Sequence, residues 1–350
     1  MLPPVCAAID RTSVHRLTSG QVIIDLQTAV KELVENALDA GATTISVKFR
    51  EHGLDEIEVE DNGRGIEKED WPGLALKHHT SKLTSFDDLA SVSTLGFRGE
   101  ALSSLCGVAT LSITTCTSPT LPLGTALSFT SAGELRIGSK RVSRSRGTTV
   151  KVEKLFENLP VRRKELSKNA KREMGKAIEM VQAYALINLG VRFEVRNIVK
   201  GKSQVLLQTP ISTTLRANFS NLFAPKSLAS LLDLDLTLEV PTEKTVMKRL
   251  EEGAVESSTT VRVKGLISKP SAPHGRPAGN RQFYYINGRP FAPVKVAKAV
   301  NESYKSFNAN QFPTVVADFQ LAPDAYDVNV SPDKRTIFLH SEGNLIACLK

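Results

Sequence analysis

The sequence predicts an α+β fold in two domains, residues 1–210 and 211–350. Segments in which apolar and polar residues alternate, as in strands, are mixed with segments whose apolar residues repeat as in helices. The regular alternation of apolar and polar residues ends near "QTPIS" (208–212), and a second series of strands follows. A chain of 350 residues is long enough for two hydrophobic cores. The first domain is therefore expected to be a sheet covered by helices.

The elements of the first domain follow from these two periodicities. A helix is expected within "KELVENALDAGA" (31–42), where Gly41 ends it. Further helices are expected over 85–92, with Ser85 as a possible N-cap, and over 170–188. Strands are expected over 44–50, 55–61, 108–117, 125–138, 148–155 and 191–197.

The second domain reads as a smaller set of strands with one helix. The strands are expected over 235–240, 260–268, 282–288 and 314–321, and the helix over 294–307. The polar segment 241–258 is weakly patterned and is expected to be an inserted loop. The Pro/Gly-rich basic segment 268–281 is expected to be a mobile loop.

Positive charge is concentrated in two stretches of an otherwise ordinary composition. The chain has 41% hydrophobic and 23% charged residues and a net charge of +8. Residues 136–176 hold 14 lysines and arginines against four glutamates, and residues 257–301 hold eight against no acid. Such clusters are typical of a nucleic-acid-binding surface. A merely soluble surface is the alternative.

The cysteines predict no metal site or disulfide framework. Cys6, Cys106, Cys116 and Cys348 form no CxxC pair and no ligand pattern with the six histidines. No apolar run reaches the length of a membrane span, and the N-terminus lacks the pattern of a signal peptide. We therefore expect a soluble protein of a reducing, intracellular compartment.

The helix within "KELVENALDAGA" carries an unusual stripe opposite its apolar face. Three carboxylates and an amide lie within two turns, with only Lys31 close by: Glu32, Glu35, Asn36 and Asp39. Like charges at this spacing repel each other. A solvated acidic face is the ordinary interpretation. A functional site is the alternative, and the rest of the chain has to decide between them.

Glycine-rich segments further along the chain favour phosphate binding. In "DNGRGI" (61–66), Gly63 and Gly65 leave room for a ligand close to the backbone, although alone the pattern is equally typical of a strand-end turn. "STLGFRGEALSSLCG" (93–107) is more specific, because a Gly-rich loop that leads into a helix N-terminus binds phosphate oxygens. "KHHTSKL" (77–83) and "RGTTV" (146–150) add hydroxyl groups and a lysine. The chain contains neither a Rossmann fingerprint nor a P-loop.

Taken in this order, the motifs resemble the Bergerat nucleotide-binding fold of gyrase B, Hsp90, histidine kinases and MutL. "KELVENALDAGAT", "DNGRGI", "TSK", "LGFRGEAL" and "NLPVRRKEL" resemble the MutL-type mismatch-repair ATPases in particular. "YYINGRP" and "YDVNVSPDKR" resemble the second, ribosomal-S5-like domain of that family. "AIDRTSVHRLTSGQVI" and "ALKHHTSK" are most similar to the eukaryotic post-meiotic-segregation branch, and "TSGQV" departs from the usual bacterial "AAGEV".

The resemblance implies roles for individual residues. Glu32 would be the general base that activates the attacking water, and Asn36, one turn on, would coordinate Mg²⁺. Asp61 would accept a hydrogen bond from the adenine amino group. Lys334, an ordinary exposed lysine without the resemblance, would reach the γ-phosphate from the second domain. The lid and the remaining contacts to ATP would come from Gly65, Lys82, Gly96, Phe97, Arg98, Gly99, Glu100, Ala101, Leu102 and Thr149.

The resemblance also implies a cycle and partners. ATP binding would order the lid and the N-terminal segment. Together with slow hydrolysis, it would drive dimerisation of N-terminal halves and close a clamp on DNA. The alternative is a DNA-associating scaffold that binds ATP with little turnover. A MutL-homologue-one type subunit, a MutS-type mismatch-recognition complex and DNA are the expected partners, in the nucleus. The basic stretches themselves, which include Arg276, Arg281 and Arg289, predict DNA contacts without sequence preference, since no zinc finger or helix-turn-helix is evident. The chain is expected to be an N-terminal fragment without the endonuclease domain of the family.

Overall fold

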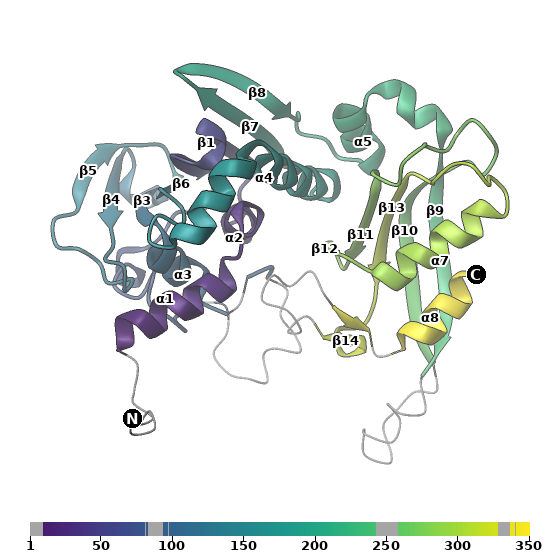
Figure 1. Cartoon of the computed structure of the whole chain (residues 1–350), viewed down its shortest axis with the longest axis horizontal. Helices are drawn as coiled ribbons and strands as arrows, with labels where there is room; N and C mark the ends of the chain where they lie inside the picture. The colour runs from purple at the N-terminus through teal and green to yellow at the C-terminus, as the bar shows by residue number, and fades with distance from the viewer. Residues whose placement is uncertain are drawn as a thin grey trace, which may run out of the picture. The chain divides into compact units, whose positions relative to one another are not determined.

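The computed structural model describes residues 10–80, 82, 94–96, 98–242, 258–327, 337–339 and 341–350. The chain forms two compact units (Figure 1). The first runs to Gln182 and includes Gly190–Ile211, and the second comprises Ala183–Leu189 and Ser212–Lys350. This division lies close to the boundary expected at 210/211, except that the end of one long helix belongs to the second unit.

The first unit is built on an eight-stranded sheet in the order β5-β4-β3-β6-β2-β1-β7-β8. Neighbouring strands pair antiparallel except β1 and β7, which are parallel. The strands are β1 (Thr44–Arg50), β2 (Glu56–Asp61), β3 (Thr110–Cys116), β4 (Leu123–Ser128), β5 (Lys140–Ser143), β6 (Gly147–Glu153), β7 (Arg192–Val199) and β8 (Lys202–Gln208).

The helices of this unit lie beside the sheet (Figure 1). They are α1 (Arg11–Val22), α2 (Leu26–Asp39), α3 (Ala101–Val108) and α4 (Pro160–Ile187). Helix α2 packs on β1 and β2, α3 packs on β3, and α1 packs against α3. The sequence sets both ends of α2. The Asp25 carboxylate accepts a hydrogen bond from the Thr28 N–H at 2.7 Å, and Gly41 adopts φ +72° just beyond Asp39.

The second unit is a five-stranded sheet in the order β12-β11-β13-β10-β9 with helices on both faces. Its helices are α5 (Leu215–Phe223), α7 (Val294–Lys305) and α8 (Glu342–Leu349). Its strands are β9 (Leu231–Pro241), β10 (Ser258–Ser268), β11 (Gln282–Ile286), β12 (Arg289–Phe291) and β13 (Val315–Gln320), beside a separate pair β14 (Tyr326–Asp327) and β15 (Phe338–Leu339). Short 3₁₀ turns span Glu51–Gly53, Lys68–Asp70, Ser118–Thr120, Pro225–Ser230 and Pro323–Ala325.

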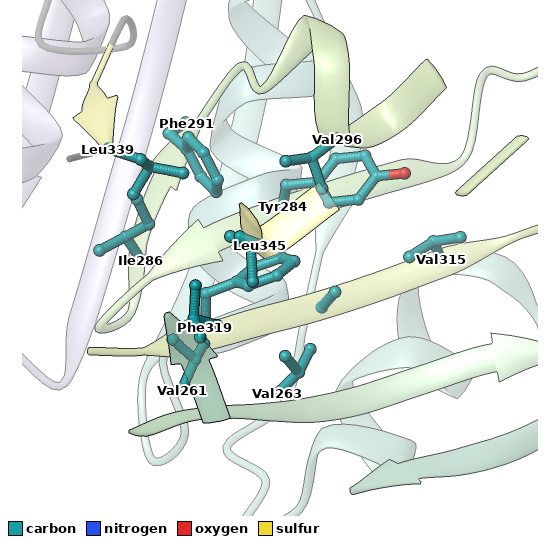
Figure 2. Close-up of a cluster of buried hydrophobic side chains, with 12 residues drawn as sticks. Val261, Val263, Tyr284, Ile286, Phe291, Val296, Val315, Phe319, Leu339 and Leu345 are labelled. Atoms are coloured by element: carbon teal, nitrogen blue, oxygen red, sulfur yellow. The ribbon is translucent and has the colours of Figure 1, made fainter. Parts of the chain in front are cut away.

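Alternation along the central strands gives this sheet two hydrophobic cores. On β11, Tyr284 and Ile286 point to the core under α7 and α8, which Figure 2 shows together with Val296 and Leu345. Tyr285 points to the opposite core and donates a hydrogen bond from its hydroxyl to the Ala183 carbonyl at 2.8 Å. This bond fastens the end of α4 to the second unit.

Several elements differ from those expected. The strand expected over 125–138 ends at Ser128, because the chain turns back so that Leu135 bridges to Phe129. The expected loop at 241–258 is flanked by paired strands, with Pro241 opposite Ser258, and its interior lies outside the described residues. The helix expected over 85–92 lies outside them as well. Strands β5, β8, β12, β14 and β15 and helices α1, α5 and α8 were not predicted.

Within the described ranges, no helix combines the length and the apolar character needed to cross a bilayer.

Candidate nucleotide-binding site

The charged stripe of α2 is buried rather than solvated. Lys31 is 3% exposed and lies between two carboxylates, with its Nζ 3.0 Å from Glu32 Oε1 and 2.8 Å from Glu35 Oε2. Burial by itself would lower the pKa of Lys31, but the negative charges of Glu35 and Glu32 outweigh it, so this pKa is raised above 10.5. The ordinary interpretation, a solvated acidic face, is therefore wrong for this helix.

One turn further along α2, Asn36 and Asp39 contact segments from the expected lid. Lys82 Nζ donates to Asn36 Oδ1 at 3.1 Å and forms an ion pair with Asp39 Oδ2 at 2.6 Å. The backbone N–H groups of Leu95 and Gly96 each donate to the Asp39 carboxylate at 2.9 Å. A Cβ on Gly96 would lie only 3.0 Å from Lys82 Nζ, so a glycine leaves the space this group needs.

Asp61, at the end of β2, presents a buried carboxylate. Its side chain accepts the N–H of Gly63 at 2.8 Å and the N–H of Thr148 at 3.2 Å, both on Oδ1. From the described residues, Oδ2 accepts no hydrogen bond. Asp61 is only 8% exposed, and this burial raises its pKa although the two backbone bonds and the charge of Arg144 act to lower it. A buried acceptor with one free oxygen is suited to a ligand donor.

Glycines bring the end of β2 close to its neighbours. A Cβ on Gly147 would lie 2.0 Å from the Asp61 carbonyl oxygen, so the first residue of β6 must be glycine. Gly65, at φ +78°, approaches the Cys116 carbonyl in the same way. The Arg64 N–H donates to the Ala40 carbonyl at 3.0 Å, which holds the loop after Asp61 against the end of α2.

The loop before α3 is fixed by contacts with residues 77–79. Gly99 adopts φ +62°, and its carbonyl accepts the His78 N–H at 3.1 Å. The Glu100 carboxylate lies 3.9 Å from Lys77 Nζ and 3.7 Å from His78 Nδ1. Glu100 is the N-cap residue of α3, so the N–H groups of the first turn begin at Ala101. This loop and the end of α2 both lie in the first unit.

Most of the predicted nucleotide residues lie in the first unit, where Thr148 and Thr149 have different partners. Thr148, rather than Thr149, lies beside Asp61: the Thr149 hydroxyl instead accepts a hydrogen bond from Arg144. Thr148 also lies 3.3 Å from Thr115 across β6 and β3. Sequence reasoning missed Thr148 because strand register decides which of two adjacent threonines faces the carboxylate.

Asp39 and Arg144 were missed as site residues for a different reason. Asp39 belongs to the unusual stripe of α2 and lies three residues after Asn36, on the same face of the helix. This spacing could have identified Asp39 as a site residue. Arg144 had no signal, because its partners come from two other strands. Phe97 and Lys334 lie outside the described residues, and Leu102 and Arg98 lie inside them.

The three arginines expected at DNA differ in accessibility. Arg276 donates to Asn280 Oδ1 at 3.1 Å, and Arg281 stacks over the Phe223 ring at 4.6 Å with both side chains partly exposed. Arg289 is only 8% exposed. Arg289, in the β11–β12 hairpin, therefore offers less surface to a phosphate than the other two arginines.

Comparison with known proteins shows the family. Residues 24–154 match the model of the histidine kinase-, DNA gyrase B- and HSP90-like ATPase, and residues 239–350 match that of the DNA mismatch repair protein, C-terminal domain. A crystal structure of the N terminal domain of a DNA repair protein superposes with a TM-score of 0.83 at 44% identity, covering 96% of this chain and 95% of that one. The chain belongs to the MutL family of DNA mismatch repair proteins.

Two curated MutL-family relatives align along almost the whole chain. DNA mismatch repair protein PMS1 of Saccharomyces cerevisiae is 45% identical and mismatch repair endonuclease PMS2 of Homo sapiens is 44% identical, each over 98% of the chain. The chain spans 39% of the length of each. An ADP complex of the Aquifex aeolicus MutL ATPase domain superposes with a TM-score of 0.53 at 24% identity. The expected Bergerat fold followed by a ribosomal-S5-like domain is thereby confirmed.

Proposed function

We propose that this MutL-family chain binds ATP with Mg²⁺ and hydrolyses it slowly, as a switch for association with DNA and with partner subunits. The observation that carries the proposal is the meeting of α2 with the end of β2. The loop after Asp61 bonds to Ala40, so the helix with Glu32 and Asn36 and the buried Asp61 carboxylate belong to one site.

Asp61 is proposed as the adenine-binding residue. Its Oδ1 is held by two backbone N–H groups, which leaves Oδ2 to accept the 6-amino group of adenine. Guanine carries a carbonyl at this position, so a carboxylate acceptor favours ATP over GTP. Thr148 contributes its backbone N–H to Asp61, and its hydroxyl lies 3.3 Å from the hydroxyl of Thr115. Thr149 is proposed as a further contact to ATP.

Glu32 is proposed as the general base. It takes a proton from the attacking water, whose oxygen then bonds to the γ-phosphorus while ADP leaves. Lys31 holds the Glu32 carboxylate at 3.0 Å and also neutralises Glu35, which lets two buried acids stay in one helix. General-base catalysis is worth about 10²–10⁴ in rate.

Asn36, Lys82 and the loop before α3 are proposed to hold the phosphates and the metal. Asn36 Oδ1 is the type of oxygen ligand that Mg²⁺ prefers, and it lies near Gly96 and the Lys82 ammonium group. Bound there, Mg²⁺ would neutralise charge on the β- and γ-phosphates. Among the described residues, no three His, Cys, Asp or Glu side chains gather into a metal-binding group. Gly65, Arg98, Gly99, Glu100, Ala101 and Leu102 complete the proposed ATP contacts, together with Phe97.

Lys334 is proposed as a γ-phosphate sensor from the second unit. A lysine is a compact charge on a long flexible stem, which suits it to reach a phosphate that only ATP carries. Its place in "SPDKR" is the support for this role, since it lies outside the described residues.

A row of exposed lysines on α4 supports a DNA-binding surface in the basic stretch 136–176. Lys164, Lys168 and Lys171 lie at helical i, i+4 and i+7 positions, opposite the buried stripe that contains Leu166 and Ala170. None of the three forms an ion pair with a described acid, so their charges are available to phosphates. Arg276 and Arg281 are proposed as further contacts. Binding through phosphates alone is independent of base sequence.

The proposed partners are those of the family: a MutL-homologue-one type subunit and a MutS-type complex, in the nucleus. Endonuclease activity is not proposed for these residues. The test of the function is steady-state phosphate release from ATP with Mg²⁺, compared between the wild type and Glu32→Ala. Turnover that depends on Glu32 supports the ATPase, whereas ATP binding without turnover in the wild type supports the scaffold.

A further inference from the structure

Arg144 is a buried cation beside the strand that carries Asp61. Its side chain is 9% exposed, and it lies just after β5. Its backbone N–H donates to the Pro122 carbonyl at 3.0 Å, so the residue is anchored to the start of β4. The proposed chemistry of ATP hydrolysis makes no use of this arginine, and its burial therefore requires another reason.

The guanidinium group joins the ends of two strands. Nη2 donates to the Asp61 carbonyl on β2 at 3.2 Å, and Nε donates to the Gly147 carbonyl on β6 at 3.3 Å. Nη1 donates to the Thr149 hydroxyl and lies 3.5 Å from Glu60 Oε1. A guanidinium is planar and presents its donors in a fixed fork, so it fixes the spacing of the groups that it bonds.

This spacing determines the geometry of the Asp61 carboxylate. The regular pairing of β2 with β6 ends at Glu60 and Thr149. Beyond that pair, the Thr148 N–H still has to reach Asp61 Oδ1, and it does so at 3.2 Å. Arg144 bonds to the carbonyls of Asp61 and Gly147, the residues on either side of this contact. Without the arginine, the two strand ends are free to separate, and Oδ1 loses one of its two anchors.

We propose that Arg144 is a positioning residue for base selection, which aligns the Asp61 carboxylate with the 6-amino group of the purine. The proposal rests on the proposed adenine-binding role of Asp61. Arg144 itself touches no nucleotide in this assignment. Its effect is therefore confined to nucleotides that carry the 6-amino group, and this separates it from a purely structural role.

The chain offers a matched control at the other end of the same strand pair. Arg163 Nη1 donates to the carbonyls of Leu54, just before β2, and Leu155, just after β6, at 2.8 and 3.0 Å. Arg163 thus joins the same two strands through the same kind of bond, but at the end remote from Asp61. Loss of either arginine removes hydrogen bonds to two backbone carbonyls.

The test measures equilibrium binding of two nucleotides by titration calorimetry. One is a non-hydrolysable ATP analogue, and the other is its counterpart with purine in place of adenine, which lacks the 6-amino group. Arg144→Ala should weaken binding of the first by about tenfold, the worth of one well-placed hydrogen bond, and leave the second nearly unchanged. Arg163→Ala should preserve the ratio of the two affinities. Arg144→Lys keeps the charge without the fork and should also lose the preference.

Each outcome decides the proposal. Suppose that Asp61→Asn abolishes the preference for the ATP analogue over its purine counterpart, but Arg144→Ala leaves this ratio of affinities unchanged. That result overturns the positioning role and leaves the adenine assignment intact. A ratio that Asp61→Asn does not change overturns the adenine assignment itself. If Arg144→Ala does not fold, the ratio in Arg144→Lys decides, because a lysine fills the same site. Equal losses for both nucleotides in Arg144→Ala and Arg163→Ala would reduce Arg144 to a structural residue.

Discussion

Replacing Lys31 by methionine tests whether the site depends on a buried ion network. The substitution leaves Glu32 and Glu35 on α2 without their shared cation, and both are almost fully buried. Removing one partner of a buried pair costs about 3–5 kcal/mol, because a charge then stays buried without compensation. This cost is a large fraction of the total free energy of unfolding of a domain, which is about 5–15 kcal/mol. The free energy of unfolding of the first unit should therefore fall by about that amount.

Lys151 provides the control. It also lies between two carboxylates, 3.4 Å from Glu56 and 3.1 Å from Glu58, but its side chain is 36% exposed. Lys48 and Arg50 remain beside the same two carboxylates, so Lys151→Met should cost no more than about 1 kcal/mol. The chain's single tryptophan, Trp71, belongs to the first unit, and its fluorescence in a urea titration reports the unfolding of that unit.

The pH dependence gives the same experiment a second readout. The pKa of Lys31 is raised, so the stability that it contributes is fully present below 10.5 and is lost as the pH rises through its folded pKa. Lys31→Met lacks this titrating group, so the stability difference between the wild type and the variant should shrink as the pH rises through the folded pKa of Lys31. An equal cost for Lys31→Met and Lys151→Met, or a stability difference that does not shrink at alkaline pH, would refute the reasoning.

The remaining predictions concern nucleotide and DNA. Glu32→Ala should keep ATP binding and slow phosphate release by about 10²–10⁴, whereas Asn36→Ala should lose Mg²⁺-dependent binding as well; equal losses of affinity contradict the two roles. Lys334→Ala should lower the affinity for a non-hydrolysable ATP analogue and reduce the protection from protease that this analogue gives to residues 77–100. The affinity for ADP should stay nearly unchanged. Equal losses of affinity for both nucleotides would exclude a γ-phosphate sensor. Changing the three α4 lysines to glutamate should weaken binding to every duplex and flatten the dependence of log K on log salt. The control with the same charge change replaces three other exposed lysines, Lys200, Lys202 and Lys226, and a similar loss there would exclude an α4 surface.

The sequence alone was sufficient where a local pattern decides the structure. The alternation of "TISVKFR" and "DEIEVED" predicted β1 and β2 almost to the residue, and Gly41 marked the end of α2. The resemblance to MutL rested on local motifs of the same kind. Strand β8 escaped prediction because it is an edge strand whose residues are largely exposed, so it lacks the alternation, and only its pairing with β7 defines it.

Only the tertiary structure decided what depends on groups from several elements. The stripe of α2 could be solvated or functional, and packing placed Lys31, Glu32 and Glu35 in the interior, where the three charges must compensate one another. Register placed Thr148 beside Asp61 and turned its neighbour Thr149 towards Arg144. A pattern along one segment records which side chains share a face. It does not record which distant segment covers that face, and this second fact determines burial, charge compensation and the free oxygen of Asp61.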